Sequence, residues 1–345
     1  MKTQQNILIP QLKGNKKQSS IFDKFGRKFN YLRIALNEQC NLRCIYCMPE
    51  AGINFRSEDK LLSTEEIYKL IKIASQMGVS KIRFTGGEPL LRKDILRIIK
   101  FTNSLKKIKS THLTTNGLLL SNKINELENS GLTGINISLD TLNAEKYKKI
   151  TRRNCLDLVL LGIEKALKSK IEVIKLNVVT MKEFNDEELI DFVELTKNND
   201  ITVRFIELMP FDSHQIWKTG KFYGADQIIS DIKKQVDILT PVLGSRTEHH
   251  IFKVNDYKGK VAVIPAYSRS LCGECNRIRI TADGKLLNCL YSQNEINLRD
   301  EIRNGISDIN LISLIKGTME NKLIDGWEAQ NQGSDNRESM TQIGG

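Results

Sequence analysis

YLRIALNEQCNLRCIYCMPE, residues 31–50, decides the fold that we expect for this chain of 345 residues. Its first residues alternate apolar and polar side chains, which is typical of a β-strand, and Cys40, Cys44 and Cys47 follow directly. Three thiolates in so short a loop can bind three corners of a 4Fe-4S cluster and leave one iron without a protein ligand. Zinc would normally need a fourth ligand, and His112 is remote in the sequence. The stretch therefore predicts a strand that leads into an iron–sulfur loop.

Strand-like and helix-like segments alternate from this stretch to about residue 209. Strands are expected at 31–37, 81–86, 111–116, 134–140, 171–180 and 201–208. Helices are expected near 63–78, 92–106, 121–130, 157–169 and 186–198. The clearest helix begins at a capping box of Ser63 and Glu66 and ends at Gly78. Repeated strand–helix units predict parallel strands joined by right-handed crossovers, and hence an α/β fold.

The expected strands have one apolar phase and one polar phase. The polar phase carries Arg33, Arg83, Asn136, Lys175 and Arg204. Parallel sheets are normally covered on both faces, and buried charge without partners is costly, so this phase requires a polar interior. A partial (β/α) barrel with a wide polar lumen meets both conditions, and we favour it over an open doubly wound sheet. The lumen is expected to hold a charged ligand.

Charge and cysteine usage restrict the class of protein. The formal net charge of +11 favours anionic partners such as a nucleotide, but the lysines are spread along the chain and form no nucleic-acid arm. Neither a membrane-spanning run nor a signal peptide is expected. Six of the seven cysteines fall in two tight groups, which predicts reduced, metal-binding cysteines in a cytoplasmic protein. Cys155 lies outside both groups and is interpreted as a buried thiol.

Three regions are expected along the chain. Residues 1–27 are interpreted as a mobile basic N-terminal arm, 28–235 as the partial barrel, and 236–345 as a smaller C-terminal subdomain with a flexible Gly-Gly tail. The subdomain contains LCGECNRIRITADGKLLNC, residues 271–289, with the second cysteine group, Cys272, Cys275 and Cys289. A Cys-x-x-Cys pair is common in zinc sites, and His249 or His250 could complete one here. A second iron–sulfur cluster is the other interpretation.

The first cysteine group, taken together with TGGEP at residues 85–89, resembles the radical S-adenosylmethionine (SAM) enzymes. Paired glycines at a strand end permit a close approach of the backbone to a ligand, and Glu88 could accept a hydrogen bond from an ammonium group. Other stretches, among them KIRFTGGEPLLRKD, INISLD, RFIELMP, CNRIRIT and the terminal GG, are similar to the GTP 3′,8-cyclases, the family of molybdenum cofactor biosynthesis protein A. The similarity runs from about residue 28 to the final glycines.

The resemblance implies SAM, two 4Fe-4S clusters and a radical SAM type of partial barrel whose C-terminal subdomain carries the second cluster. The metal ligands would be Cys40, Cys44, Cys47, Cys272, Cys275 and Cys289. SAM would contact Tyr46, Gly87, Glu88, Ser138 and Met209. GTP would contact Arg33, Arg83, Thr114, Lys175, Arg277, Ile278 and Arg279. The residues with catalytic roles would be Arg33, Arg277, Arg279, Gly344 and Gly345.

The activity that this resemblance implies is the conversion of GTP to 3′,8-cyclo-7,8-dihydro-GTP in molybdenum cofactor biosynthesis. An adenosyl radical takes the hydrogen from C3′ of the ribose, and the resulting carbon radical attacks C8 of guanine. The resemblance also implies a homodimer, an external electron donor and a downstream partner, cyclic pyranopterin monophosphate synthase.

Two other classes of protein remain open at this point. Another radical SAM enzyme with an auxiliary cluster, such as a peptide maturase, would need further cysteines after the barrel, and only three occur there. A zinc-binding nucleic-acid module would fit the basic charge and the Cys-x-x-Cys pair. Metal content separates the module from the enzyme, because only the enzyme would contain iron.

Overall fold

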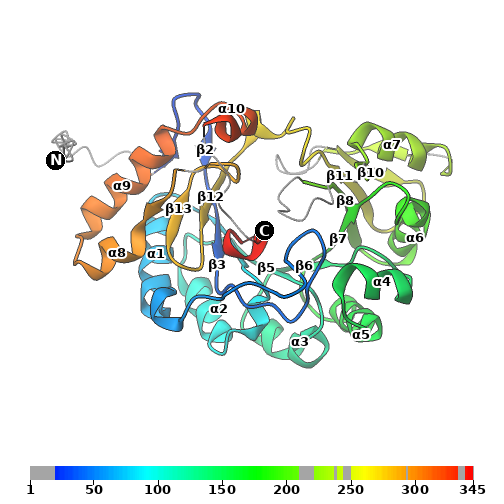
Figure 1. The fold of residues 1–345 in the computed structure, drawn as a ribbon, viewed down its shortest axis with the longest axis horizontal. Helices are drawn as coiled ribbons and strands as arrows, with labels where there is room; N and C mark the ends of the chain where they lie inside the picture. The colour runs from blue at the N-terminus through cyan, green and yellow to red at the C-terminus, as the bar shows by residue number, and fades with distance from the viewer. Residues whose placement is uncertain are drawn as a thin grey trace.

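A curved sheet of parallel strands forms the centre of the computed structural model, which describes residues 20–209, 221–236, 239–243, 250–292, 294–332 and 339–344 (Figure 1). All the strands expected before residue 209 are present: β3 (Tyr31–Ala35), β4 (Lys81–Thr85), β5 (Ser110–Thr115), β6 (Gly134–Ser138), β7 (Val173–Thr180) and β8 (Ile201–Glu207). They pair in the order of the sequence, and every pair is parallel. The expected α/β architecture with parallel strands is confirmed.

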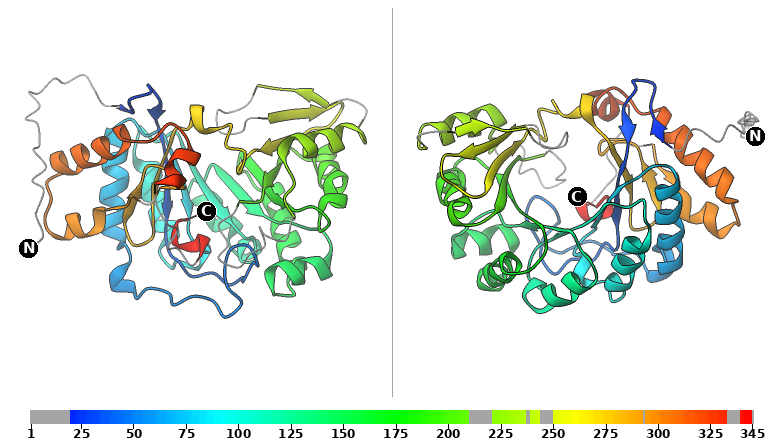
Figure 2. Two further views of the ribbon diagram at one scale, coloured as in Figure 1. Left: turned by 45° about the horizontal axis from the view of Figure 1, so that its top comes forward. Right: turned by 180° about the vertical axis from the view of Figure 1, so that it is seen from behind.

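Helices cover the outside of this sheet, as the ribbons in Figure 2 show. They are α1 (Thr64–Gln76), α2 (Ile95–Ser104), α3 (Leu120–Asn129), α4 (Ala144–Thr151), α5 (Leu156–Leu167) and α6 (Leu189–Asn198), with short 3₁₀ turns η1 (Glu58–Lys60), η2 (Pro89–Leu91) and η3 (Asp186–Glu188). The capping box of α1 forms as predicted, with Ser63 and Glu66 each accepting from the other's backbone N–H. Helix α4 was not expected, and it makes β6 to β7 a crossover with two helices.

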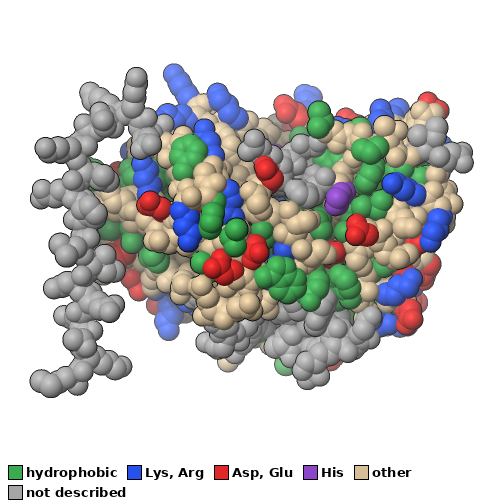
Figure 3. All heavy atoms as spheres, turned by 90° about the horizontal axis from the view of Figure 1, so that it is seen from above, with side chains coloured by type: hydrophobic (Ala, Val, Ile, Leu, Met, Phe, Trp, Pro, Cys, Tyr) green, Lys and Arg blue, Asp and Glu red, His purple; other side chains and the backbone are tan. Residues whose placement is uncertain are grey.

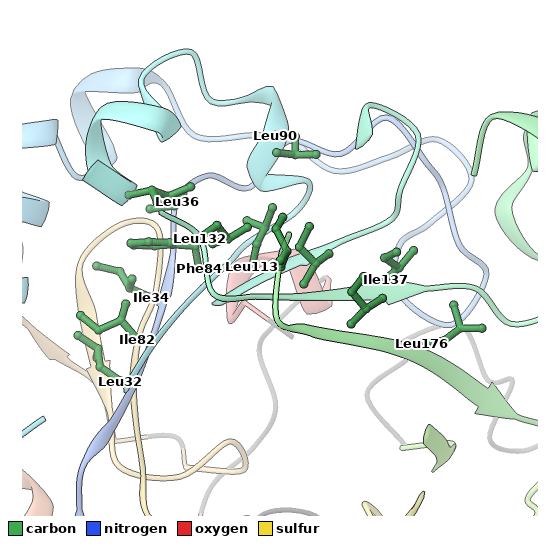
Figure 4. Packing of buried hydrophobic residues seen from close by; sticks show 14 of the residues in the cluster. Leu32, Ile34, Leu36, Ile82, Phe84, Leu90, Leu113, Leu132, Ile137 and Leu176 are labelled. Carbon is green, nitrogen blue, oxygen red and sulfur yellow. The ribbon is translucent and has the colours of Figure 1, made fainter. Parts of the chain in front are cut away.

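The hydrophobic core lies between the sheet and these helices. Figure 4 shows side chains of the apolar phase from successive strands, including Leu32, Ile34, Ile82, Phe84 and Ile137. All five are at most 1% exposed. Since one phase of each strand packs into this core, the other phase faces the inside of the barrel. The physical argument from alternating phases is thus confirmed.

The C-terminal part extends both edges of the same sheet. On one side β12 (Arg277–Ile280) pairs in parallel with β3, and β13 (Lys285–Leu287) and β14 (Ile296–Asn297) follow. On the other side β11 (Lys260–Ile264) pairs in parallel with β8, and β10 (His250–Val254) and β9 (Leu239–Pro241) follow. We expected a subdomain packed on the barrel, whereas these strands continue the barrel sheet itself.

The remaining helices pack around these added strands. They are α7 (Ala225–Lys233), α8 (Leu298–Arg303), α9 (Asp308–Glu320) and α10 (Gly326–Asn331), with the turns η5 (Cys272–Glu274) and η6 (Met340–Gln342). Among the described residues, no helix is both long enough and apolar enough to cross a membrane. On the face seen in Figure 3, Lys and Arg side chains lie among acidic and apolar side chains.

The described chain begins with a small hairpin of β1 (Ile21–Phe22) and β2 (Lys28–Phe29). Ile21 and Phe29 are fully buried, so this part of the expected N-terminal arm is folded. Residues 1–19 of that arm lie outside the described residues. The boundary that we expected at residue 27 falls inside the hairpin. We missed the hairpin because strands of two residues are too short to give an alternating sequence pattern.

Candidate functional site

A large cavity occupies the inside of the barrel and contains about 2180 Å³ of space between atoms, part of it open to solvent. The interior-facing phases of β3 to β8, β11 and β12 line it. Both cysteine groups line it as well: Cys40, Cys44, Cys47, Cys272, Cys275 and Cys289. Residues more than 230 positions apart in the sequence therefore face one space.

The first cysteine loop is held against the end of β4 by two glycines. A Cβ atom on Gly87 would overlap the backbone carbonyl oxygen of Gln39, and one on Gly86 would overlap that of Asn37. Gly86 also has φ +136°, which side chains rarely permit. The Gly-Gly pair thus lets the backbone of β4 approach the cysteine loop. This packing explains the two glycines more directly than the ligand contact that we expected. Gly87 does line the cavity.

Glu88 does not face the cavity. Its carboxylate is fully buried and accepts from Leu90 N at 3.0 Å, Thr115 Oγ1 at 2.8 Å and Asn116 N at 2.7 Å. Burial raises its pKa to about 7 despite these bonds. We expected Glu88 to accept from the ammonium group of SAM, whereas its oxygen atoms are occupied in joining β4 to the end of β5.

The other expected SAM residues line the cavity next to the first cysteine group: Tyr46, Ser138 and Met209. The hydroxyl of Tyr46 donates to Asp140 at 2.6 Å, and the N–H of Val179 donates to the same carboxylate at 2.8 Å. Burial raises the pKa of Asp140 to about 6, although both hydrogen bonds oppose the rise. This arrangement joins the cysteine loop to the ends of β6 and β7.

Two cysteines of the second group, Cys272 and Cys275, lie in the segment that joins β11 to β12, and Cys289 follows β13. Cys272 begins η5, and Cys275 closely precedes the strand that pairs with β3. The side chain of Arg27 donates to the carbonyl oxygen of Cys272 at 2.9 Å, and Asp23 balances its charge at 2.5 Å. The N-terminal hairpin thereby supports the second cysteine group.

The thiols of the two groups differ in acidity. Burial raises the pKa of Cys44 well above its ordinary value and that of Cys47 to about 12. Burial also raises the pKa of Cys275, but the charges of Arg277 and Lys322 outweigh it and lower this pKa to about 6. Cys44 and Cys47 therefore need a bound cation to ionise at neutral pH, and burial raises the pKa of Cys272 as well, whereas Cys275 already has positive charge beside it.

These donor sets fit two cubane clusters. Within each group the thiols are close enough to influence one another's pKa. Among the described residues no three Cys, His, Asp or Glu side chains converge as one metal ion would require. A cubane does not require such convergence, because each thiolate binds a different iron. His249 lies outside the described residues, and His250 lies in β10, away from the cavity lining.

A layer of buried arginines crosses the lumen at the level of β12, β3 and β4. The sheet register places Arg279 beside Arg33, and Arg33 beside Arg83. Arg277 lies next to Tyr31 on the neighbouring level. Nε of Arg33 and Nη1 of Arg279 have no hydrogen-bond partner among the described residues. Such donors fit the oxygen atoms of a phosphate.

The charges in this layer act strongly on one another. Burial lowers the pKa of Arg279 well below its ordinary value, and repulsion from Arg33 and Arg277 lowers it further. Burial raises the pKa of Tyr31, but the neighbouring charges of Arg83, Arg33 and Lys81 outweigh it and lower this pKa to about 7. The lumen thus has a strong positive potential in the absence of a ligand.

The other three expected GTP residues differ from one another in their relation to the cavity. Thr114 lines the cavity, and its hydroxyl has no hydrogen-bond partner among the described residues. Lys175 lies in the same interior phase, level with Asn136, but outside the set of residues that line the cavity. The side chain of Ile278 packs into the hydrophobic core, because it belongs to the apolar phase of β12. Only its backbone remains available for the contact that we expected.

The C-terminal tail enters the lumen, as Figure 1 shows near β3. Ser339 Oγ and Met340 N both donate to the carbonyl oxygen of Cys47, at 2.8 and 3.1 Å. Gly344 is buried beside Ala35 and Thr85, and Thr85 Oγ1 donates to its carbonyl oxygen at 3.4 Å. Gly344 is thus packed inside the barrel instead of lying in a flexible tail, which agrees with the resemblance, since that implied that the two glycines reach into the active site. Gly345 lies outside the described residues.

Several cavity residues were not expected from the sequence. Tyr31 and Lys81 lie two positions before Arg33 and Arg83, so extending the polar phase by one step would have identified them. Arg27, Arg269 and Lys322 also line the cavity. No strand or cysteine pattern includes these three residues, and their positions follow only from the tertiary structure.

Two known protein families match consecutive parts of this chain. Residues 34–196 match the family described as the radical SAM superfamily, and residues 201–325 match the one described as Molybdenum Cofactor Synthesis C. The two matches join within the continuous sheet, between α6 and β8.

Full-length relatives are also found. A GTP 3′,8-cyclase of Chlorobaculum tepidum is 40% identical over 329 residues, which cover 95% of this chain and 98% of that protein. Molybdenum cofactor biosynthesis protein 1 of Dictyostelium discoideum is 44% identical over 314 residues, which cover 89% of this chain and 49% of that protein. This chain therefore spans about half the length of the Dictyostelium relative.

A solved structure shares the fold at low sequence identity. Streptococcus suis SuiB bound to S-adenosylmethionine matches with a TM-score of 0.58 and 16% identity, covering 85% of this chain and 68% of that chain. The likeness extends beyond the parallel strands into the C-terminal part.

Proposed function

Because the chain belongs to the GTP 3′,8-cyclase family of the radical SAM superfamily, we propose that it converts GTP to 3′,8-cyclo-7,8-dihydro-GTP in the biosynthesis of the molybdenum cofactor. The reaction removes a hydrogen atom from C3′ of the ribose and joins C3′ to C8 of guanine, and one electron and one proton then convert the resulting radical to the 7,8-dihydro ring. One observation carries the proposal: both cysteine groups and a layer of buried arginines line a single cavity.

Cationic side chains of the barrel hold the triphosphate. Arg33, Arg83 and Arg279 come from three adjacent strands, and guanidinium groups donate in pairs to phosphate oxygens. Free donors on Arg33 and Arg279 supply these bonds without breaking existing ones. The repulsion between these cations falls when the triphosphate binds, which adds to the affinity for a polyanion.

Cys40, Cys44 and Cys47 hold the first cluster, and Cys272, Cys275 and Cys289 hold the second. When bound, the first cluster and SAM supply the adenosyl radical that removes the C3′ hydrogen, and the second cluster supplies a binding position for guanine. Tyr46, Ser138 and Met209 line the space that SAM occupies. Gly87 contributes backbone there, whereas Glu88 supports the loop from behind.

The protein's own contribution is to hold the substrate and exclude water. Gly344 packs against Ala35 and Thr85, on the inner phase of β3 and β4. A Cβ atom there would overlap both residues, so glycine lets the tail lie this close to the barrel wall. Arg277 and Lys322 keep positive charge beside the second cluster. Such fixed geometry lets the ribose approach the adenosyl group without solvent between them.

The biological setting follows from the family. We expect a cytoplasmic homodimer that receives electrons from an external donor and passes its product to cyclic pyranopterin monophosphate synthase.

Anaerobic incubation of the reconstituted protein with SAM, a reductant and GTP tests the proposal. We expect 5′-deoxyadenosine and the cyclised nucleotide, identified by mass spectrometry and by conversion to a pterin. Iron analysis should give about eight atoms per chain for two clusters. Zinc without iron would instead support a nucleic-acid module, and 5′-deoxyadenosine without change to GTP would support a different radical SAM enzyme.

A further inference from the structure

Lys322 is a buried cation next to the second cysteine group. It lies just after α9, is 4% exposed and lines the same cavity as Cys272, Cys275 and Cys289. Its ammonium group donates to the carbonyl oxygen of Asn288, the residue before Cys289. It therefore touches the segment that carries one ligand and faces the other two.

No described carboxylate balances this charge. Lys322 has one hydrogen bond, to a neutral carbonyl group, and its Nζ lies 6.0 Å from the ring centre of Phe29. A buried ammonium group without a counter-ion is costly, and two of its three N–H groups lack a protein acceptor among the described residues. The candidate counter-ions are the thiolates of the second group, because Lys322 lines the same cavity as all three cysteines and contacts the residue before Cys289.

Rigid contacts fix Lys322 in this position. Arg27 donates to the carbonyl oxygens of Leu323 and Ile324, both at 2.6 Å, and to that of Cys272 at 2.9 Å. One guanidinium group thus joins the chain that follows Lys322 to the turn that carries Cys272. The ammonium group cannot move away from the cysteines without breaking these bonds.

We propose that Lys322 is a positioning residue of the second cluster that sets its reduction potential by fixed positive charge, an inference that rests on the proposed two-cluster function. Reduction adds a negative charge to the cluster, and a buried cation nearby stabilises that charge. Loss of the cation makes reduction harder.

The test measures the reduction potential of the second cluster in full-length protein. Replacing Cys40, Cys44 and Cys47 by alanine leaves one group able to hold a cluster, so its spectrum is seen alone. In this background Lys322→Met removes the charge and keeps an apolar stem of similar length. We expect the ratio of reduced to oxidised cluster at a fixed potential to fall about tenfold, equivalent to about 59 mV for a one-electron couple.

Two variants provide the comparison. Lys322→Arg keeps the charge and should keep the potential near that of the parent. Lys24→Met removes an exposed lysine from the hairpin and should leave the potential unchanged. If Lys322→Met does not fold, Lys322→Gln carries the same test, since it keeps a donor for Asn288 without the charge.

The outcomes separate this inference from the proposed function. An unchanged potential in Lys322→Met, with iron fully retained, overturns the role of Lys322 and leaves the two-cluster proposal intact. Absence of iron in the parent with the second group alone overturns the second cluster itself. An equal shift in Lys322→Met and Lys322→Arg would assign the effect to packing and also overturn the inference.

Discussion

Arg279 illustrates how the site stores electrostatic strain in a single residue. It is 4% exposed, lies beside Arg33 and near Arg277, and has a free donor at Nη1. Like charges packed in an interior destabilise the folded chain, and such strain typically marks functional sites. The arrangement becomes favourable only when an anion enters. Removing the charge of Arg279 should therefore raise the stability of the ligand-free protein and weaken its binding of GTP.

We therefore predict that Arg279→Met raises the stability of the ligand-free protein by about 1 kcal/mol, as relief of functional strain often does. The same change should weaken GTP binding at least about tenfold, because a hydrogen bond to a charged group is worth about 1.5–3 kcal/mol. Urea unfolding and equilibrium binding measure the two effects. Arg153→Met, which removes an exposed arginine, is the control for net charge. Equal loss of stability and affinity would contradict the prediction.

Tyr31 should report the same positive potential through its pKa. A tyrosine with a folded-state pKa near 7 and an ordinary value of 10.0 is more ionised in the folded chain. Its contribution to stability is therefore present at high pH and is lost as pH falls from about 10 through 7. Ultraviolet titration of the cluster-free protein should show one phenolate forming near pH 7, absent from Tyr31→Phe. GTP, by adding negative charge, should move this step to higher pH.

At the scale of helices and strands, the spacing of apolar residues predicted the elements that pack one face on the core. The strands β3 to β8 and helices α1, α2, α3, α5 and α6 were predicted because each has an apolar phase over several turns or residues. The polar phase also predicted the lumen and its arginines. Helix α4 is only eight residues long, and its buried positions were too few to indicate a helix.

The missed features depend on contacts distant in sequence. Nothing in β12 itself indicates that it pairs with β3, more than 240 residues earlier. The close backbone approach at Gly87 and the inward carboxylate of Glu88 follow from the position of the cysteine loop, which the TGGEP motif does not specify. Lys322 lies just after α9, and its burial results from contacts of this part of the chain with Arg27 and with the second cysteine segment.

The tail offers a test of one such element. Gly344 has φ +68°, and a Cβ atom there would lie 2.7 Å from Thr85 Oγ1 and 2.8 Å from the Cβ atom of Ala35. Gly344→Ala should therefore release the tail and sharply reduce cyclisation, because left-handed backbone costs an alanine about 1 kcal/mol before the overlap is counted. Hydrogen exchange at residues 339–344 and the rate of product formation measure the change.

A matched glycine separates tail docking from general effects. Gly317 lies in α9, and a Cβ atom added to it would have no neighbouring atom within 4 Å among the described residues, so Gly317→Ala should leave both measurements unchanged. It should also stabilise the helix slightly, since alanine is the better helix former. Iron content should stay the same in both variants. A docked tail and normal turnover in Gly344→Ala would show that the lumen tolerates a side chain there.

For the whole molecule, the C-terminal part of the chain completes the sheet that the central strands begin. The barrel strands β3 to β8 leave two open edges, and β12 and β11 pair with them. The segment between β11 and β12, residues 265–276, carries Cys272 and Cys275 from one edge to the other. Cys272 and Cys275 thus lie where the chain crosses the open side of the barrel, close enough to Cys289 after β13 for the three thiols to act on one another. Closing the barrel and bringing the second cysteine group together are therefore one structural event.

A fragment of residues 1–235, the arm and barrel that we expected to form separate regions, should therefore not fold stably alone. It would expose the unpaired edges of β3 and β8 and the apolar side chains that Val261, Val263 and Ile280 bury. We expect it to aggregate or to unfold without cooperativity in urea. Co-expression with residues 236–345 should restore a soluble complex, because β11 and β12 then supply both partner strands. Cooperative unfolding of the fragment alone, at the midpoint of the full chain, would mean that the barrel is an autonomous domain and that the continuous sheet adds little to its stability.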